Sequence, residues 1–181
     1  ENATFSYDMA TSLLELNADE PLIIAALAFK SAQDLSRNQL RKHFDPVVTK
    51  LIMGTHNIQK IEDLSQQANL TREGHADNLR KMLLAMVDDV RVVVLKLMEQ
   101  LATLRSLREA PPAAQKEAAL RVQHMYAPLA NRLGIGQIKW QLEDWSFRYL
   151  QREKYSELKA ALNMRREDRE VYVTTVIADI T

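Results

Sequence analysis

Apolar residues recur every three to four positions along most of the chain, and no stretch shows the strict apolar–polar alternation of a half-buried strand. The chain has 181 residues but only 4 Gly and 5 Pro, so few positions interrupt these helical patterns. A chain of this length can bury a core without disulfide bonds or a structural metal. We therefore expect a single all-α domain over residues 1–181.

Proline and capping residues set the boundaries of the expected helices. Asp45 before Pro46 is the pattern of an N-cap followed by proline in the first turn, and Ser36 is the expected cap of a short helix. Pro128 falls inside a helical stretch and predicts a kink just before it. Residues 63–73 are polar without periodicity and are expected to form a loop. The expected helices span residues 9–16, 22–34, 36–44, 47–61, 74–87, 90–107, 113–125, 137–150, 153–162 and 167–180.

Charge and cysteine content exclude several classes of function. Because 24 Lys and Arg balance 24 Asp and Glu, no whole-domain field attracts nucleic acid or an anionic membrane. The absence of Cys excludes disulfides, iron–sulfur clusters and a thiol nucleophile, and it favours a reducing compartment. No apolar run approaches the ~18 residues of a membrane span, and no secretory signal pattern is present. We expect a cytoplasmic protein with no membrane partner.

The residues alone indicate no catalytic chemistry. A helical zinc site needs two histidines four residues apart with a carboxylate nearby, and no pair of the four histidines has this spacing. Asp88 and Asp89 precede Val90 and are expected to cap the following helix, because adjacent helix residues do not face one ligand. A glycine-rich phosphate loop and a nucleophile elbow are both missing.

Two long segments carry a resemblance to a known family. The first covers residues 78–97 and contains the run Val92-Val-Val-Leu-Lys-Leu97. The second begins with Tyr126-Ala-Pro-Leu-Ala-Asn-Arg-Leu-Gly-Ile135 and continues into the next expected helix. Both segments, in this order, resemble the RelA/SpoT family of long stringent-response enzymes, which make or degrade the alarmone (p)ppGpp. The likeness covers nearly the whole chain.

This resemblance implies both a fold and a domain organisation. The matching region is the N-terminal hydrolase half of these enzymes, an all-helical domain of the HD superfamily. The synthetase domain is expected to follow it. The chain begins with Glu1 rather than Met, so we expect residues 1–181 to be one HD-like domain of a longer protein.

The resemblance also implies that the metal site of this domain is degenerate. Hydrolytic members hold Mn²⁺ with a His, a His-Asp doublet and a distant Asp, and they remove the 3′ pyrophosphate of (p)ppGpp. These ligand positions correspond here to Phe5, to Phe29 and Lys30, and to Glu99. Phe offers no lone pair, and Lys30 brings a positive charge that opposes a cation. The expectation is therefore no metal cofactor and no hydrolysis by this domain.

Loss of the ligands resembles the synthetase-only branch of the family. The full protein would then be a RelA-type GTP pyrophosphokinase, which transfers pyrophosphate from ATP to GTP or GDP. This domain would be a regulatory, non-catalytic neighbour whose partner is the protein's own synthetase domain. Ribosome and tRNA contacts would belong to C-terminal domains of the full protein.

Two alternatives remain open at this stage. In the first, the old pocket binds a guanine nucleotide such as (p)ppGpp as an allosteric ligand, with Lys30, Arg105 and Arg132 contacting phosphates. Arg105 and Arg132 are equally well explained as ordinary surface or ion-pair residues. In the second alternative, residual hydrolysis uses Asp34, Glu99 and His124 as ligands, a set that supplies few donors for a metal.

Overall fold

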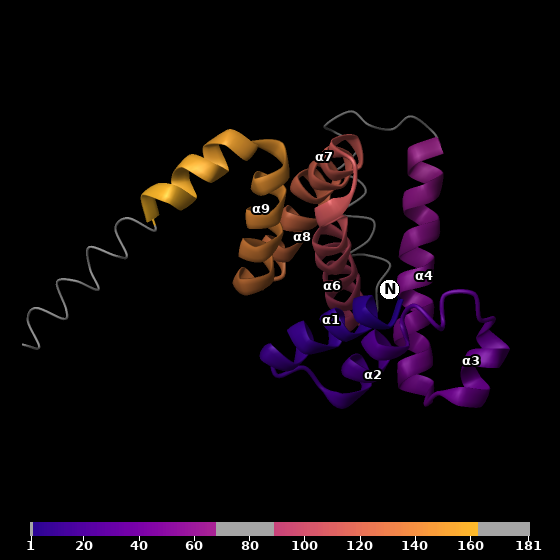
Figure 1. The fold of residues 1–181 in the computed structure, drawn as a ribbon. Helices are drawn as coiled ribbons and strands as arrows, with labels where there is room; N and C mark the ends of the chain where they lie inside the picture. The colour runs from indigo at the N-terminus through magenta and orange to yellow at the C-terminus, as the bar shows by residue number, and fades with distance from the viewer. Residues whose placement is uncertain (1, 68–88, 163–181) are drawn as a thin grey trace, which may run out of the picture.

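The computed structural model describes residues 2–67 and 89–162, which are helical nearly throughout and contain no strand (Figure 1). The expectation of an all-α fold is confirmed. The predicted helices at residues 74–87 and 167–180 lie outside the described residues. The helices are α1 (Asn2–Glu15), α2 (Glu20–Ala28), α3 (Arg37–His43), α4 (Pro46–Gln67), α6 (Val90–Ser106), α7 (Pro112–Arg121), α8 (Ala127–Arg132), α9 (Gly136–Leu150) and a helix over residues 152–162.

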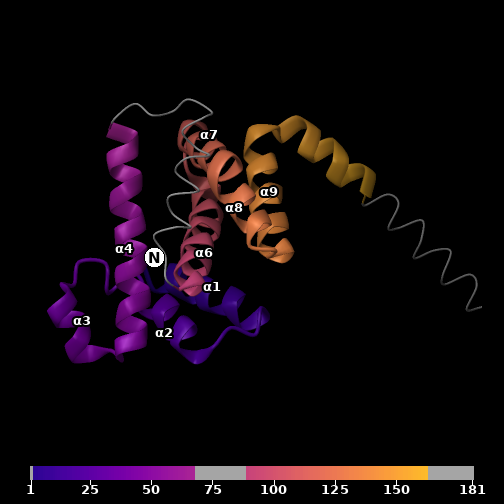
Figure 2. The ribbon, with the colours of Figure 1, turned by 180° about the vertical axis from the view of Figure 1, so that it is seen from behind.

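Helix α6 lies at the centre of the fold. It packs against α1 and α2 at one end, against α4 on one flank and against α7 and α9 on the other (Figures 1 and 2). Its burial follows from its sequence, because apolar residues occupy most of its surface. The fully or nearly fully buried apolar residues of α6 are Val92, Val93, Leu95, Leu97, Met98, Leu101, Ala102 and Leu104.

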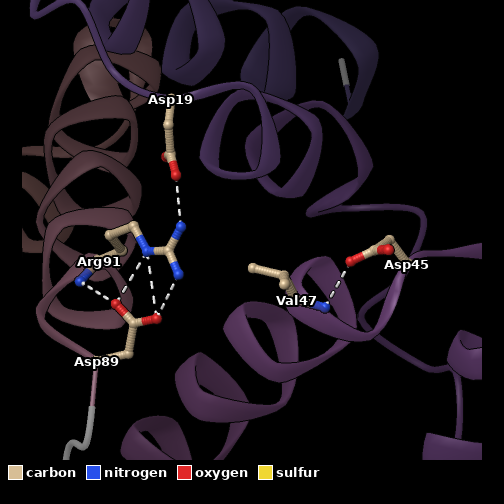
Figure 3. Close-up of polar contacts among 5 residues, drawn as sticks. All are labelled: Asp19, Asp45, Val47, Asp89 and Arg91. Carbon is tan, nitrogen blue, oxygen red and sulfur yellow. Dashed lines mark hydrogen bonds and ion pairs between the residues drawn. The ribbon is translucent and has the colours of Figure 1, made fainter.

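The helix starts agree with the capping predictions. The Asp45 carboxylate accepts a hydrogen bond from the Val47 amide at 2.8 Å, directly before α4 (Figure 3). Ser36 forms a capping box with Gln39 at the start of α3. At the start of α6, the Asp89 carboxylate accepts from the Arg91 amide at 3.0 Å. Each of these side chains satisfies an amide that has no partner within its own helix.

Three predicted boundaries are wrong. The helix expected to begin at residue 9 begins at Asn2. The helix expected over residues 22–34 ends at Ala28. The Ser31 hydroxyl donates to the Ala28 carbonyl at 2.9 Å, an alternative to regular helical bonding that favours a turn. The loop expected at 63–73 is helical as far as Gln67, because an exposed helix tolerates a polar, non-periodic stretch. Residues 68–73 lie outside the described part.

The chain kinks before Pro128, as predicted. Residues Val122–Tyr126 form a π-helical turn between α7 and α8, in which the Ala127 amide donates to the Val122 carbonyl five residues earlier. A proline without an amide hydrogen cannot continue regular helical bonding, and the wider turn accommodates this loss. Gly134, with φ of 73°, then reverses the chain into α9. Among the described residues, no helix is both long and apolar enough to cross a membrane.

Arg91 joins the starts of two helices (Figure 3). Its guanidinium bonds the Asp89 carboxylate through Nε at 3.0 Å and also pairs with Asp19, which precedes α2. The hydrogen bond from the Arg91 side chain is the main reason why the pKa of Asp89 lies below its usual value. Stability from this interaction is therefore present above the ordinary pKa of Asp and is lost as the pH falls through the lower, folded-state pKa.

We expect Arg91→Gln to lower the melting temperature slightly at pH 7, because the pair is partly exposed and screened by water. When thermal unfolding is measured from pH 2.5 to 7, the melting temperature of the variant should fall less steeply toward low pH than that of the wild type. Added NaCl should shrink the difference at pH 7. If the melting temperatures of the two proteins fell equally toward low pH, this role of Arg91 would be contradicted.

Helices α4 and α6 approach closely at Gly54. A Cβ atom at this position would lie 2.7 Å from both Cγ atoms of Val92. Val92 is buried, so its branched side chain has little room to move. Glycine at position 54 therefore permits the contact that brings the polar residues of α4 next to those of α6.

We expect Gly54→Ala to destabilise the fold by about 1–3 kcal/mol, because overpacking a core costs this much. The direction of this change in stability is informative, since Gly→Ala at an ordinary exposed helix position stabilises a protein by roughly 0.5–1 kcal/mol. Chemical denaturation measures the effect. Adding Val92→Ala to Gly54→Ala should cost less than the sum of the single changes, and strictly additive effects would argue against the close contact.

Candidate functional site

A cavity of about 460 Å³ opens between the turn after α2, α3, α4 and α6. Its lining is mixed in polarity, with charged side chains at its wall and apolar ones from the core. The side chains of this lining that carry a charge, an imidazole or a cluster amide are Asp34, Arg37, His56, Gln59, Lys60, Lys96 and Glu99. The cavity is large enough for a small ligand.

Lys96 lies at the wall of this cavity with only 1% of its side chain exposed. Its Nζ atom is 2.7 Å from Glu99 Oε2 and 3.2 Å from Glu62 Oε2. It also donates to Gln59 Oε1 at 2.5 Å. A buried charge is tolerated when it is paired and hydrogen-bonded, and Lys96 meets both conditions. We call Lys96, Glu62, Glu99 and Gln59 the buried lysine cluster.

Tyr126 extends this cluster to the π-helical turn. The side chain is fully buried, and its hydroxyl donates to Glu62 Oε1. Burial raises the pKa of Glu62, while Lys96 and Tyr126 act in the opposite direction. Burial also raises the pKa of Tyr126, with the Glu62 carboxylate adding to that effect. Both oxygens of Glu62 thus have partners, one on α6 and one beside α8.

His56 contributes the imidazole in the lining. Burial lowers its pKa below the usual value, and the neighbouring Lys60 adds to that shift. Its Nε2 atom is buried and has no hydrogen-bond partner within residues 2–67 and 89–162. The cavity wall therefore contains an imidazole with a buried, unpartnered Nε2 atom, beside the buried ion pair of Lys96 and Glu99.

Residues 3–136 match the family model described as HD domain. The chain belongs to the HD-domain family. Its match covers every element that builds the cavity, from α2 to α6, and it extends to the start of α9.

Curated relatives of this HD domain include enzymes of (p)ppGpp metabolism. It is 40% identical over 176 residues to the GTP pyrophosphokinase of Escherichia coli, a match that covers 96% of this chain and 24% of the relative. It is 37% identical over 177 residues to the GTP pyrophosphokinase of Photobacterium angustum, with the same shares covered. A probable guanosine-3′,5′-bis(diphosphate) 3′-pyrophosphohydrolase of Synechocystis sp. is 36% identical over 170 residues, which cover 93% of this chain and 22% of that protein. These matches confirm the RelA/SpoT resemblance, and the chain spans about a quarter of each relative.

The structure places the positions that the resemblance equates with metal ligands in two pairs. The Lys30 ammonium lies 4.3 Å from the ring centroid of Phe5, as a cation–π pair between α1 and the turn after α2. The Lys30 amide donates to Ser6 Oγ at 3.4 Å, which fixes this turn against α1. Phe29 and Glu99 line the cavity together. Within the described ranges, no group of three or more His, Cys, Asp or Glu is placed to hold a metal ion.

The three residues that were expected to contact phosphates lie outside the lining of the cavity. None of Lys30, Arg105 and Arg132 lines the cavity. Arg105 instead bonds Asp8 Oδ1 at 2.7 Å and Gln141 Oε1 at 2.8 Å, so it ties α6 to α1 and α9. Arg132 is exposed at the end of α8. The structure therefore favours the ion-pair interpretation of Arg105, and phosphate binding by Lys30 and Arg132 stays a prediction.

The ligand set suggested for residual hydrolysis does not come together as a triad in this cavity. Asp34 and Glu99 line it, whereas His124 is exposed on the π-helical turn and is not in the lining. His56 provides the histidine of this cavity instead.

Sequence reasoning missed the buried lysine cluster. The available signal was Lys96 itself, a charged residue inside the apolar run Val92–Met98 and three residues before Glu99. A charge on a core-facing helix surface indicates a buried partner. The identity of that partner could not be inferred, because Glu62 lies on a different helix.

Proposed function

We propose that this HD domain is a non-hydrolytic regulatory domain of a RelA-type GTP pyrophosphokinase. The observation that carries the proposal is the contact between Lys30 and Phe5. Two positions equated with metal ligands hold an ammonium and an aromatic ring, neither of which donates a lone pair to Mn²⁺. A fixed positive charge there also opposes binding of a divalent cation.

Contacts between the cavity and α8 support a regulatory role. The Tyr126 hydroxyl connects the π-helical turn before α8 to Glu62, and Glu62 pairs with Lys96 in the cavity wall. A displacement of α8 would therefore change the partners of a buried carboxylate, at a cost in free energy. Regulation requires such a contact to differ between two states of the protein. We propose the adjoining synthetase domain as the partner that biases these states.

The experiment compares (p)ppGpp synthesis by the complete protein with that of two variants. Tyr126→Phe removes the bond to Glu62, and Arg132→Glu reverses an exposed charge at the end of α8. We expect each to change synthesis by about fivefold, a typical size for allosteric coupling. The control is Tyr149→Phe, which removes a hydroxyl bond to the Leu104 carbonyl on the α6–α9 side. Unchanged synthesis in both variants would overturn the proposal.

A second candidate function is guanine-nucleotide binding in the cavity. Its volume of about 460 Å³ and the cations Arg37 and Lys60 in its lining favour this candidate. Titration of ppGpp into the 181-residue chain by calorimetry, with and without Mn²⁺, tests it. Metal-independent binding that Lys60→Gln weakens supports the candidate. Absence of heat in both conditions would leave a domain that acts only through protein contacts.

A further inference from the structure

A second hollow, of about 320 Å³, lies away from the cavity and shares no lining residue with it. It opens between the turn Leu107–Glu109 after α6, helix α7, the C-terminal half of α9 and the helix over residues 152–162. Its lining residues are Arg108, Gln115, Arg148, Tyr149, Arg152, Tyr155, Ser156 and Lys159. Half of them carry a positive charge and none carries a negative one.

The cations of this hollow are not paired with carboxylates of the described residues. Within the described ranges, no ion pair joins Arg108, Arg148, Arg152 or Lys159 to a carboxylate. Burial raises the pKa of the Tyr149 hydroxyl, and the three arginines of the hollow act against that rise. Like charges gathered around one hollow repel each other, so an anion bound there would relieve this repulsion.

Buried and aromatic side chains hold the arginines in place. Gln115, only 2% exposed, donates to the carbonyls of Leu107 and Arg108 at 2.8 and 3.0 Å and accepts a hydrogen bond from Arg152. The guanidinium of Arg148 lies 4.9 Å from the ring centroid of Trp145, and that of Arg108 lies 5.7 Å from it. The arginines are thus positioned before any ligand arrives, which lowers the entropic cost of binding.

We propose that this hollow binds a small anion that carries at least two phosphate groups, either free pyrophosphate or the diphosphate of a nucleotide. Arginine forks match the geometry of phosphate oxygens, and three arginines with one lysine exceed the charge of a single phosphate. The volume lies at the small end of ligand pockets, which suits a diphosphate better than a macromolecule. The inference does not depend on the proposed function, because it rests on a separate set of residues.

Tryptophan fluorescence of the 181-residue chain provides the test. The chain has 2 Trp, and Trp140→Phe removes the exposed one, so that Trp145 beneath the arginines is the sole reporter. Titrations at constant ionic strength use pyrophosphate, orthophosphate, sulfate and GDP. We expect saturable binding of pyrophosphate at least tenfold tighter than of orthophosphate or sulfate. Comparison of GDP with pyrophosphate distinguishes a nucleotide ligand from a free one.

Charge-neutralising variants locate the site. Arg148→Gln with Arg152→Gln should weaken pyrophosphate binding at least tenfold, and the exposed Lys159→Gln alone should weaken it severalfold without any effect on folding. The matched control, Arg41→Gln on α3, should bind as the wild type does. Loss of binding in Lys60→Gln instead would place the anion in the other cavity and overturn the proposal. Equal affinity for all anions, or preferential binding of an RNA oligonucleotide, would overturn it as well.

Discussion

Lys96→Met should destabilise the domain by about 3–5 kcal/mol at pH 7, because it leaves buried carboxylates without their cation. Glu62 and Glu99 are 5% and 13% exposed, so water can replace little of what Lys96 supplies. Guanidinium or urea unfolding measures the loss. The matched control is Lys139→Met, since Lys139 also pairs with a carboxylate on its own helix, but at an exposed position. That variant should lose less than about 1 kcal/mol.

The pH dependence of Lys96→Met separates a charge effect from a packing effect. Burial already raises the pKa of Glu62, and removal of Lys96 takes away an influence that lowers it. A carboxyl whose folded-state pKa is raised contributes stability below its ordinary pKa, and that stability is lost as the pH rises through the folded-state pKa. The variant should therefore be least destabilised in acid. Glu62→Gln added to Lys96→Met should restore part of the stability at pH 7. Equal losses in Lys96→Met and Lys139→Met would contradict the buried lysine cluster.

The second large effect is a gain of metal binding. The variant Phe5→His, Phe29→His, Lys30→Asp and Glu99→Asp places Mn²⁺ ligands at the four positions that the resemblance equates with the metal site. The fold pairs Phe5 with Lys30, and Phe29 lines the cavity with Glu99. We expect calorimetry to detect Mn²⁺ binding that the wild-type chain lacks. Mn²⁺ at about 100 times its dissociation constant should stabilise the variant by about 2.7 kcal/mol.

A matched control keeps the added ligand types but moves them away from the site. Phe44→His with Lys42→Asp introduces an imidazole at the partly buried C-cap of α3 and a carboxylate at an exposed position in its last turn. This variant should show no Mn²⁺-dependent stabilisation. If the wild-type chain itself bound Mn²⁺ as tightly as the four-residue variant, the degenerate metal site would be refuted.

Most of the fold could be predicted from local sequence. The start of α6 at Val90 follows from the Asp89 cap, and its central position follows from its apolar surface. The early end of α2 was missed because residues 29–34 contain no Gly or Pro that would signal the end of a helix. The extension of α4 was missed because residues 63–67 show no apolar periodicity in the sequence.

The candidate site could be predicted only in part. The resemblance aligned Phe5 and Lys30 with ligand positions, and the structure places them in contact. The buried lysine cluster depends on pairing between α4 and α6, with Gly54 allowing the two helices to approach. Such a pairing is a property of tertiary packing, which helical periodicity does not encode. The cationic hollow was missed for the same reason, because its arginines come from three separate segments.

Release of pyrophosphate from ppGpp in the presence of Mn²⁺, measured for the complete protein and for the 181-residue chain, tests the central claim most directly. With Lys30 and Phe5 at ligand positions, we expect no release above the uncatalysed background in either protein, while (p)ppGpp synthesis by the complete protein proceeds. Mn²⁺-dependent release by the wild-type chain, abolished by Glu99→Gln, would show that this HD domain is an active hydrolase and would contradict the proposed regulatory role.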